Sequence, residues 1–322
     1  MRLKILIFMF ISLLNLNANE KIKVGVLAYG TVNWELDVLK HNKLDKKYGI
    51  DVEIVKLASK NAVSIALQSN SVDVIVNDWV WVNRQKSSGK NIAFYPYSKA
   101  VGALYVNDDK IKSLEDLSEK RLGIAGGNVD KTWLLFRAYY KNKYSKDLKD
   151  IVTPVFAAPP ILYKKMLDKS LNATINFWHF NAKLDSKGFK RLLGVKEILE
   201  ELNISSDIPL IGWTFNKDFA NNNTKAINSF LQASYETKKL LSTSPSQWNR
   251  IKPLMKVKNE EMFKALKNGY INGIVKNFST IHIENSKKVF DILYKEGGKK
   301  LVGNSTSLNS EIFWNFNPDI NW

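Results

Sequence analysis

The chain contains no cysteine, and the other residues on which catalytic and metal sites commonly depend are scarce. Its 322 residues include only three histidines, His41, His179 and His282, which lie far apart in the sequence. Without thiols the chain forms no disulfide, no thiolate metal site and no lipid-modified cysteine anchor. The histidines lack metal-ligand spacing, and neither an HExxH nor a GxSxG motif occurs. The sequence therefore predicts no catalytic residue, no metal and no cofactor.

Long apolar runs are also missing, except at the start of the chain. Arg2 and Lys4 precede a short apolar stretch that extends to Leu14. This pattern is typical of a signal peptide cleaved near Ala18, with a retained anchor or a buried first strand as the alternatives. We expect residues 1–19 to be the signal peptide and the mature chain to be a free protein of the periplasm. No later run is long and apolar enough to span a bilayer.

The sequence carries a large excess of positive charge. Its 48 Lys and Arg against 31 Asp and Glu give +17, and loss of Arg2 and Lys4 with the signal would leave +15. Such an excess suits nucleic acid, an anionic surface or an anionic ligand. The lysines are scattered, however, without a sustained basic arm, which favours solvated faces. We therefore expect no nucleic-acid partner.

The order of local patterns predicts an α/β fold. Short β-rich runs alternate with helical ones as far as about Phe215, and only helical patterns follow Lys217, so largely parallel sheets are expected. The predicted strands are 23–28, 51–57, 73–76, 92–95, 104–106, 121–125, 152–156, 174–177 and 210–215. The predicted helices are 34–48, 61–69, 79–88, 131–143, 160–169, 218–242, 245–255, 259–268 and 285–297.

Polar and aromatic residues follow most of the predicted strands. Ligands of open α/β sheets bind beyond the carboxyl ends of strands, where helix N-termini offer free N–H groups. After the first strand, Thr31 or Asn33 could cap the next helix. Tryptophans beside amide and hydroxyl groups suit a small molecule with a polar or anionic head and an apolar or planar body. The predicted solute-binding residues are Gly30, Thr31, Asn33, Trp34, Ser59, Lys60, Asn61, Asn77, Asp78, Trp79, Tyr97, Gly127, Asn128, Asp130, Asn176, Trp178 and Trp213.

Asp78 is the most specific of these candidates. Its carboxylate could pair with an amine on the solute while Trp79 supplies a cation–π wall. It could also cap the helix that follows, and the two roles are compatible. Lys60 and Lys131 could neutralise an anionic head, although single lysines in a lysine-rich chain are more often solvated. Trp133, Trp248 and Trp314 are expected in the core or at an interface.

The run from Gly126 to Thr132 resembles the end of a phosphate-binding loop, because it closes on Lys-Thr after a strand. That motif requires glycine directly before the lysine, and Asp130 occupies this place. The aspartate would also repel a phosphate. The sequence therefore predicts no nucleotide loop, but a helix start at Gly127 and Asn128 that could accept an anion.

Three stretches carry a family resemblance. They are Tyr-Gly-Ile-Asp-Val-Glu-Ile-Val at 48–55, the strand 73–76 that leads into Asn-Asp, and Ser-Leu-Glu-Asp-Leu at 113–117 before the strand 121–125. Together they resemble the NitT/TauT-type substrate-binding proteins of ABC importers (SsuA/TauA-type and NMT1/THI5-like), over essentially the whole mature chain. One departure is Glu119-Lys120 in place of the usual Gly-Lys.

The resemblance implies the type II periplasmic-binding fold, in which two α/β lobes are joined by a hinge of two crossings. Lobe I would comprise residues 20–97 and 212–322, and lobe II residues 98–211. The crossings would fall near 94–98 and 208–213, where proline or glycine stands beside aromatic residues. The turns at 30–34, 59–61, 77–79 and 127–130 would form the pocket.

The resemblance also implies a function. Such a protein captures a small solute by lobe closure, delivers it to a permease with its ATPase, and is expected to be a monomer. Nitrate alone would not need several tryptophans, so an organic solute that is anionic, zwitterionic or a planar amine is expected, such as a sulfonate, taurine or a thiamine pyrimidine. Two alternatives are a periplasmic sensor subunit and a THI5-like pyrimidine synthase. The synthase is disfavoured because its cysteine-rich motif is missing here.

Overall fold

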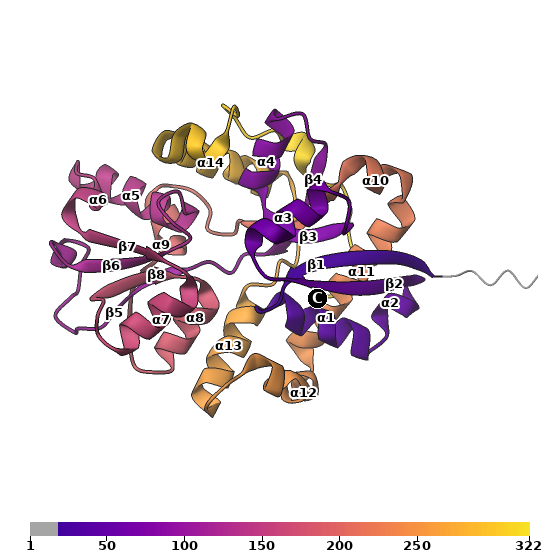
Figure 1. Cartoon of the computed structure of the whole chain (residues 1–322), viewed down its shortest axis with the longest axis horizontal. Coiled ribbons are helices and arrows are strands. Elements are labelled where there is room, and N and C mark those ends of the chain that lie inside the picture. Colours follow the sequence, from indigo (N-terminus) through magenta and orange to yellow (C-terminus); the bar gives the residue numbers. More distant parts are fainter. Residues whose placement is uncertain (1–18) are drawn as a thin grey trace, which may run out of the picture.

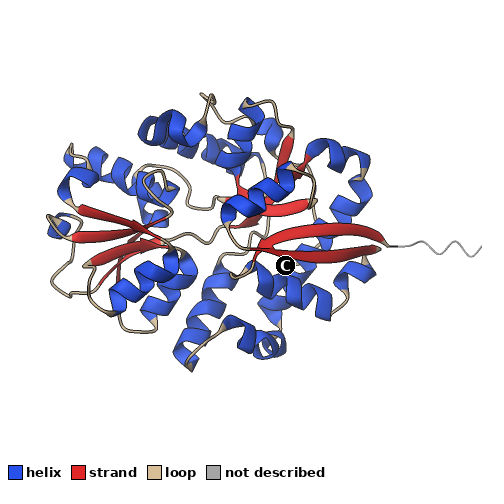
Figure 2. Ribbon diagram, viewed as in Figure 1, coloured by secondary structure: helices blue, strands red, loops and turns tan. Residues whose placement is uncertain are grey.

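The structure, a computed structural model, describes residues 19–322 and contains two five-stranded sheets, each flanked by helices (Figures 1 and 2). The predicted signal peptide lies outside the described residues, save for residue 19. The strand orders are β2-β1-β3-β10-β4 and β7-β6-β8-β5-β9. In the first sheet β10 runs antiparallel to β3 and β4, and in the second β5 runs antiparallel to β8 and β9. The remaining pairs, β1 with β2 and β3, and β6 with β7 and β8, are parallel.

The two sheets divide the chain as follows. The first sheet contains β1 (Glu20–Leu27), β2 (Ile50–Leu57), β3 (Val74–Asp78), β4 (Ile92–Ser98) and β10 (Ile211–Asn216). The second contains β5 (Ala103–Val106), β6 (Arg121–Ala125), β7 (Thr153–Ala157), β8 (Ala173–Asn176) and β9 (Lys190–Gly194). The chain thus leaves the first sheet through residues 99–102 and returns to it through residues 202–210. This confirms the predicted α/β class; the exact lobe boundaries stay a prediction.

Fourteen α-helices occur within residues 19–322. They are α1 (Val32–His41), α2 (Leu44–Lys47), α3 (Lys60–Gln68), α4 (Trp79–Ser87), α5 (Lys131–Tyr144), α6 (Leu148–Ile151), α7 (Pro159–Leu167), α8 (Trp178–Asp185), α9 (Val195–Glu201), α10 (Lys217–Asn222), α11 (Thr224–Thr243), α12 (Pro245–Met255), α13 (Glu260–Asn272) and α14 (Thr280–Val302). Over this part of the chain none of the helices has the length and hydropathy needed to cross a bilayer.

Several element predictions were wrong in detail. The expected helix 34–48 is two helices, because Lys43 adopts the left-handed conformation (φ 53°) between them. The expected strand 174–177 ends at Asn176, and Phe177 becomes the N-cap residue of α8, a helix that was not predicted. Strand β9 was missed because its short Lys-Arg-Leu-Leu-Gly sequence lacks a clear alternation.

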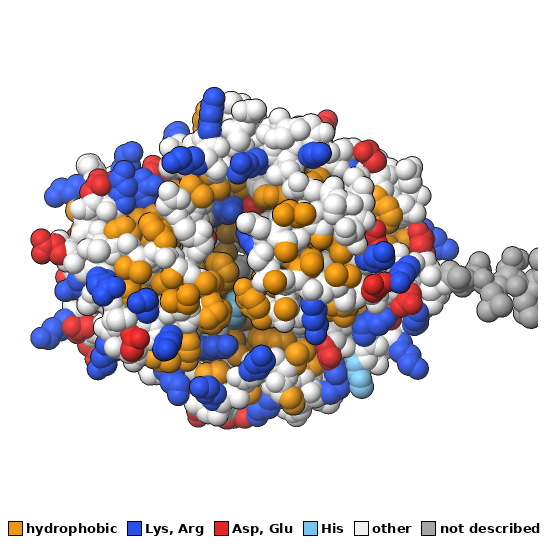
Figure 3. Space-filling model, viewed as in Figure 1, with side chains coloured by type: hydrophobic (Ala, Val, Ile, Leu, Met, Phe, Trp, Pro, Cys, Tyr) orange, Lys and Arg blue, Asp and Glu red, His pale blue; other side chains and the backbone are white. Residues whose placement is uncertain are grey.

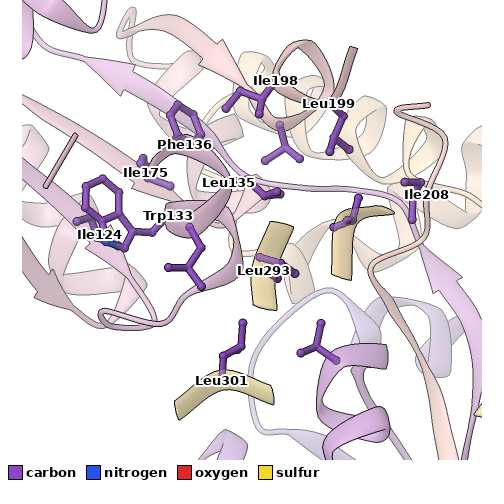
Figure 4. Packing of buried hydrophobic residues seen from close by; sticks show 14 of the residues in the cluster. Ile124, Trp133, Leu135, Phe136, Ile175, Ile198, Leu199, Ile208, Leu293 and Leu301 are labelled. Carbon is purple, nitrogen blue, oxygen red and sulfur yellow. The ribbon is translucent and has the colours of Figure 1, made fainter. Parts of the chain in front are cut away.

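The C-terminal helix α14 connects the two halves of the molecule. Its Leu293 and Leu301 belong to one buried cluster with Trp133 and Leu135 of α5 (Figure 4). Glu296 of α14 lies 3.4 Å from the Arg137 guanidinium of α5, which also pairs with Asp147 at 2.6 Å. Helix α14 packs against α4 as well. The segment assigned to lobe I therefore also contacts elements of the second sheet.

Helices α8 and α13 make a second contact between the halves. The indole ring of Trp178 packs against Gly269, where a Cβ atom would lie only 2.7 Å from the ring. Any larger residue at position 269 would require the Trp178 ring or the helices to shift. These two contacts border a hollow that is open on one face of the molecule (Figure 3).

Candidate functional site

A cavity of about 140 Å³ lies where the two halves meet. It is formed by the turn after β1, by α8 and by the end of α12. Because α8 follows β8 of the second sheet and the turn follows β1 of the first, both halves of the molecule contribute to one wall. Four predicted binding residues share this cavity, namely Gly30, Thr31, Asn33 and Trp34.

The turn after β1 is held by its own side chains. Gly30 has a φ of 113°, a conformation that glycine adopts readily. The Asn33 amide donates to the Leu27 carbonyl at 3.0 Å and to the Gly30 carbonyl at 3.3 Å. The predicted capping of α1 by Thr31 or Asn33 is wrong: Thr31 occupies the N-cap position without a side-chain hydrogen bond. Asn33 instead shapes the turn that borders the cavity.

Trp34 forms the inner wall of this cavity. Its ring is 6% exposed and packs edge-on against Trp178 at 6.4 Å and against Trp248 at 6.3 Å, measured between ring centroids. Trp178 belongs to α8 and Trp248 to α12, so Trp34 contacts a ring from each half. Its neighbour Glu35 is fully buried, where it pairs with Lys238 of α11. That buried ion pair fixes the first turn of α1 behind the cavity.

The cavity is basic and lacks a carboxylate. Lys56, Lys183 and Lys256 line it, and neither an Asp nor a Glu does. Within residues 19–322 none of these three lysines has a carboxylate within ion-pair distance. Burial and the nearby Lys183 ammonium lower the pKa of the His179 ring in the same wall to about 3, so this ring is neutral at physiological pH.

A second charged cluster joins residues of the two halves, and its charges are paired. One Asp78 oxygen accepts from the Trp81 N–H at 2.8 Å, which confirms the predicted cap of α4. The other lies 3.0 Å from the Lys131 ammonium and 3.4 Å from that of Lys60. Lys131 belongs to α5 of the second half, and its side chain is only 22% exposed. The expectation that Lys131 is solvated was therefore wrong, because Asp78 of the first half holds it.

The charged groups of this cluster shift one another's pKa values. Burial alone would raise the pKa of the Asp78 carboxyl, but Lys131 and Lys60 outweigh it and hold the pKa at about 2. Burial opposes the charge on Lys131, yet Asp78 and Asp130 raise its pKa above the ordinary value. Asp78 is thus ionised and already neutralised by lysines of this chain. Its pairing with an amine on the solute stays a prediction.

The glycine-rich turn before α5 borders the same cluster. Gly126 and Gly127 have φ values of 90° and 96°, and the Asp130 carboxylate caps α5 by accepting from the Trp133 N–H at 3.2 Å. Burial raises the pKa of Asp130. The predicted helix over 131–143 does begin at Lys131, with Gly127 and Asn128 in the turn before it, while anion binding at these two residues stays a prediction.

Other candidates have structural partners in the core. The Trp79 indole donates to the Pro209 carbonyl at 3.1 Å, and the Trp213 indole donates to the Ser234 hydroxyl at 2.9 Å. Both rings are fully buried and belong to hydrophobic clusters. Three further candidates are also buried: Asn77, Tyr97 and Asn176. Their contact with a solute stays a prediction.

Besides Lys60, three candidates lie on the surface. Ser59 caps α3, since its hydroxyl accepts from the Ala62 N–H at 3.1 Å. Asn61 and Asn128 are exposed on opposite halves. Neither lines the 140 Å³ cavity.

A larger cavity of about 430 Å³ lies beside the first crossing. Residues 99–103, α8 and α13 form its walls, and the half-buried Trp178 is among them. Helix α8 therefore presents His179 and Lys183 to the smaller cavity and Asn181 and Asp185 to the larger one. Trp178 stands between the two.

Sequence reasoning missed the lysines of the smaller cavity. His179 and Lys183 are four residues apart and so share one face of a helix, but the region was predicted as a strand up to Phe177. Lys56 is the penultimate residue of β2, and Lys256 follows α12 directly. Nothing in their local sequence distinguishes them from other lysines, so only the folded chain shows that they face one another.

A family model described as NMT1/THI5 like matches residues 46–247. The match covers more than half of the chain, and the protein belongs to this family. No curated protein sequence matches it.

Solved structures of periplasmic binding proteins share the fold. The aliphatic sulphonate binding protein SsuA from Escherichia coli has a TM-score of 0.72 at 15% identity, covering 94% of each chain. The alkanesulfonate-binding protein SsuA from Xanthomonas axonopodis pv. citri, bound to MOPS, has a TM-score of 0.67 at 13% identity, covering 91% of this chain and 98% of the other. The nitrate-binding protein NrtA from Synechocystis PCC 6803 has a TM-score of 0.55 at 16% identity, covering 78% and 69%. At such identities these likenesses confirm the two-lobed α/β fold alone.

Proposed function

We propose that the protein is the solute-binding component of an ABC importer, exported to the periplasm, where it captures a small organic solute by lobe closure and delivers it to a permease. The observation that carries this proposal is the 140 Å³ cavity, whose wall includes both Trp34 from the first half and His179 from the second. A solute in such a cavity contacts both halves at once. It therefore stabilises only the closed arrangement.

The crossings provide the hinge for this closure. The first crossing leaves β4 at Ser98, and the Lys99 N–H donates to the Gly273 carbonyl at 2.9 Å, which holds the start of the crossing against the end of α13. Residues 202–210 form the return. Rotation about these short segments would open the cavity without unfolding either sheet.

The first test is a thermal-shift series on the chain from about Glu20, with sulfonates, taurine, nitrate, bicarbonate and thiamine pyrimidines. A solute at about one hundred times its Kd adds about 2.7 kcal/mol of stability. A second measurement should follow the distance between labels on the two lobes, which the cysteine-free chain makes straightforward. The proposal predicts that the same solute raises Tm and shortens that distance; a solute that raises Tm at an unchanged distance would overturn the closure mechanism.

A periplasmic sensor subunit would need the same closing cavity. Uptake of the labelled solute by cells that lack this protein would separate the two roles. An importer component is required for uptake, whereas loss of a sensor leaves uptake intact.

We also propose that the protein is not an enzyme: within residues 19–322 no group of three His, Asp or Glu side chains is placed to hold a metal ion, and the smaller cavity holds one neutral histidine and no carboxylate.

A further inference from the structure

The three lysines of the smaller cavity come from different halves of the molecule. Lys183 projects from α8 in the second half, whereas Lys56 belongs to β2 and Lys256 directly follows α12 in the first. Closure of the lobes therefore brings like charges together. Burial, and then Lys256 and Lys258, lower the pKa of the Lys183 ammonium, as expected for a positive charge that faces others in a partly dry site.

The opposite arrangement holds where Asp78 meets Lys131. There the Lys131 ammonium of the second half meets the Asp78 carboxylate of the first at 3.0 Å. That pair favours closure, while the lysine cavity opposes it. The lysine cavity lacks a counter-charge, and a bound solute could supply one.

We propose that the solute is a small organic anion whose acidic group lies among Lys56, Lys183 and Lys256, and that its charge removes the repulsion between Lys183 and Lys256 that opposes closure. This inference rests on the proposed function and specifies the class of solute for the same cavity. An amine-bearing solute is excluded from this cavity by the same charges. The negative charge of the solute thus stabilises the closed arrangement of the lobes, because it offsets the repulsion between the lysines.

The apolar part of the cavity indicates that the anion carries an organic body. The rings of Trp34 and Phe180 and the side chain of Leu266 line the interior. At the mouth, Tyr29 is 53% and Leu254 is 39% exposed, although both line the cavity. Burial of such surface by a ligand is favourable by about 25 cal/mol per Å². A bare inorganic anion would leave this surface in water.

The experiment compares probes that share one phenyl body and differ in charge: benzenesulfonate, benzoate, benzyl alcohol and benzylamine. Binding is measured by calorimetry on the native chain and on Lys183→Met, with Lys187→Met as the matched control. Lys187 is an exposed lysine four residues further along the chain that does not line the cavity. Its replacement changes the net charge by the same amount.

We expect the two anions to bind and the alcohol and amine to bind at least tenfold more weakly. Lys183→Met should weaken anion binding about tenfold or more, which corresponds to about 1.4 kcal/mol, while Lys187→Met should leave it within about twofold. Tight binding of benzylamine or benzyl alcohol with closure, but not of the anions, would leave the solute-binding function standing and overturn this inference. Equal loss in both lysine variants would also overturn it.

A second measurement needs no solute. Labels on Gln68→Cys of α3 and Lys164→Cys of α7 report the separation of the halves in the cysteine-free chain. Removing the Lys183 charge should shift the unliganded protein toward shorter distances, whereas Lys187→Met should leave the distances unchanged. An unliganded distance that Lys183→Met does not shorten would overturn the electrostatic part, even if none of the four phenyl probes binds. Failure of every solute to bind or close the native chain would instead count against the proposed function.

Discussion

Two charged regions lie between the halves, a paired end at Asp78 and an unpaired end at the lysine cavity, and they differ in charge balance. At one end Asp78 lies between Lys60 and Lys131 and caps α4, so each charge there has a partner. At the other end three lysines line a cavity without a carboxylate. At the first end the charges are paired without a ligand, whereas at the second end the positive charge of the lysines is neutralised only when an anion binds. A polar turn after a strand can thus form ion pairs within the protein or line a site for a solute, depending on which side chains the opposite half places against it.

The strongest test of the paired end is Asp78→Ala. It removes the cap of α4 and leaves the largely buried Lys131 ammonium without its partner, so the free energy of unfolding should fall by about 3 kcal/mol. Urea unfolding measures this loss in the free energy of unfolding. Asp78→Asn retains an oxygen that can cap and should cost less. Equal losses in the two variants would show that the cap contributes little, whereas an unchanged stability of Asp78→Asn would show that the ion pair between the halves contributes little.

Trp178→Ala tests the contact between the ends of α8 and α13. The ring packs against Trp34 and Gly269 but is half-buried, so we expect about tenfold weaker solute binding with a stability loss of about 1 to 2 kcal/mol. Calorimetry and urea unfolding on one preparation separate the two effects. If the variant mainly loses stability, Trp178 is a core residue. Trp213 is already assigned to the core, because its ring is fully buried.

The unpaired end should also show a pH dependence. The pKa of His179 in the folded chain is about 3, below the ordinary 6.5, so the unfolded chain takes up a proton first as the pH falls. Stability should therefore decline between about pH 6.5 and pH 3, by about 1 kcal/mol, since the partly exposed ring is screened by water. His179→Gln should flatten this part of the curve. A bound anion should favour the protonated ring and reduce the decline.

The smallest effect is expected for Lys256→Met. This lysine has no carboxylate partner and faces Lys183, so its removal should change stability by no more than about 0.5 kcal/mol, in the stabilising direction. Thermal unfolding at low salt is the appropriate measurement, because screening hides such repulsion. A loss of 2 kcal/mol or more would reveal a structural role for this unpaired end.

Local features of the fold were predictable from the sequence to a useful degree. The alternation of strands and helices, the glycine turn before α5 and the capping role of Asp78 follow from residues within a few positions of each other. The break at Lys43 and the short strand β9 were not predicted, because a left-handed residue and an irregular edge strand leave weak local patterns. For the candidate site, the predicted turn around Trp34 does line a cavity, although its contact with a solute stays a prediction, and the lysines of that cavity were not predicted.

The sequence alone determined the α/β class, the order of the elements, the absence of thiol chemistry and the positions of the polar turns. Only the tertiary structure decided that Lys131 meets Asp78 and that Lys183 meets Lys256. These partners lie more than fifty residues apart on elements of different halves, and the crossings and the α8–α13 and α14 contacts determine how those halves face each other. The charge of an isolated lysine is fixed by its chemistry. Whether that lysine is ion-paired, solvated or free to bind an anion depends on the surface that the fold places opposite it.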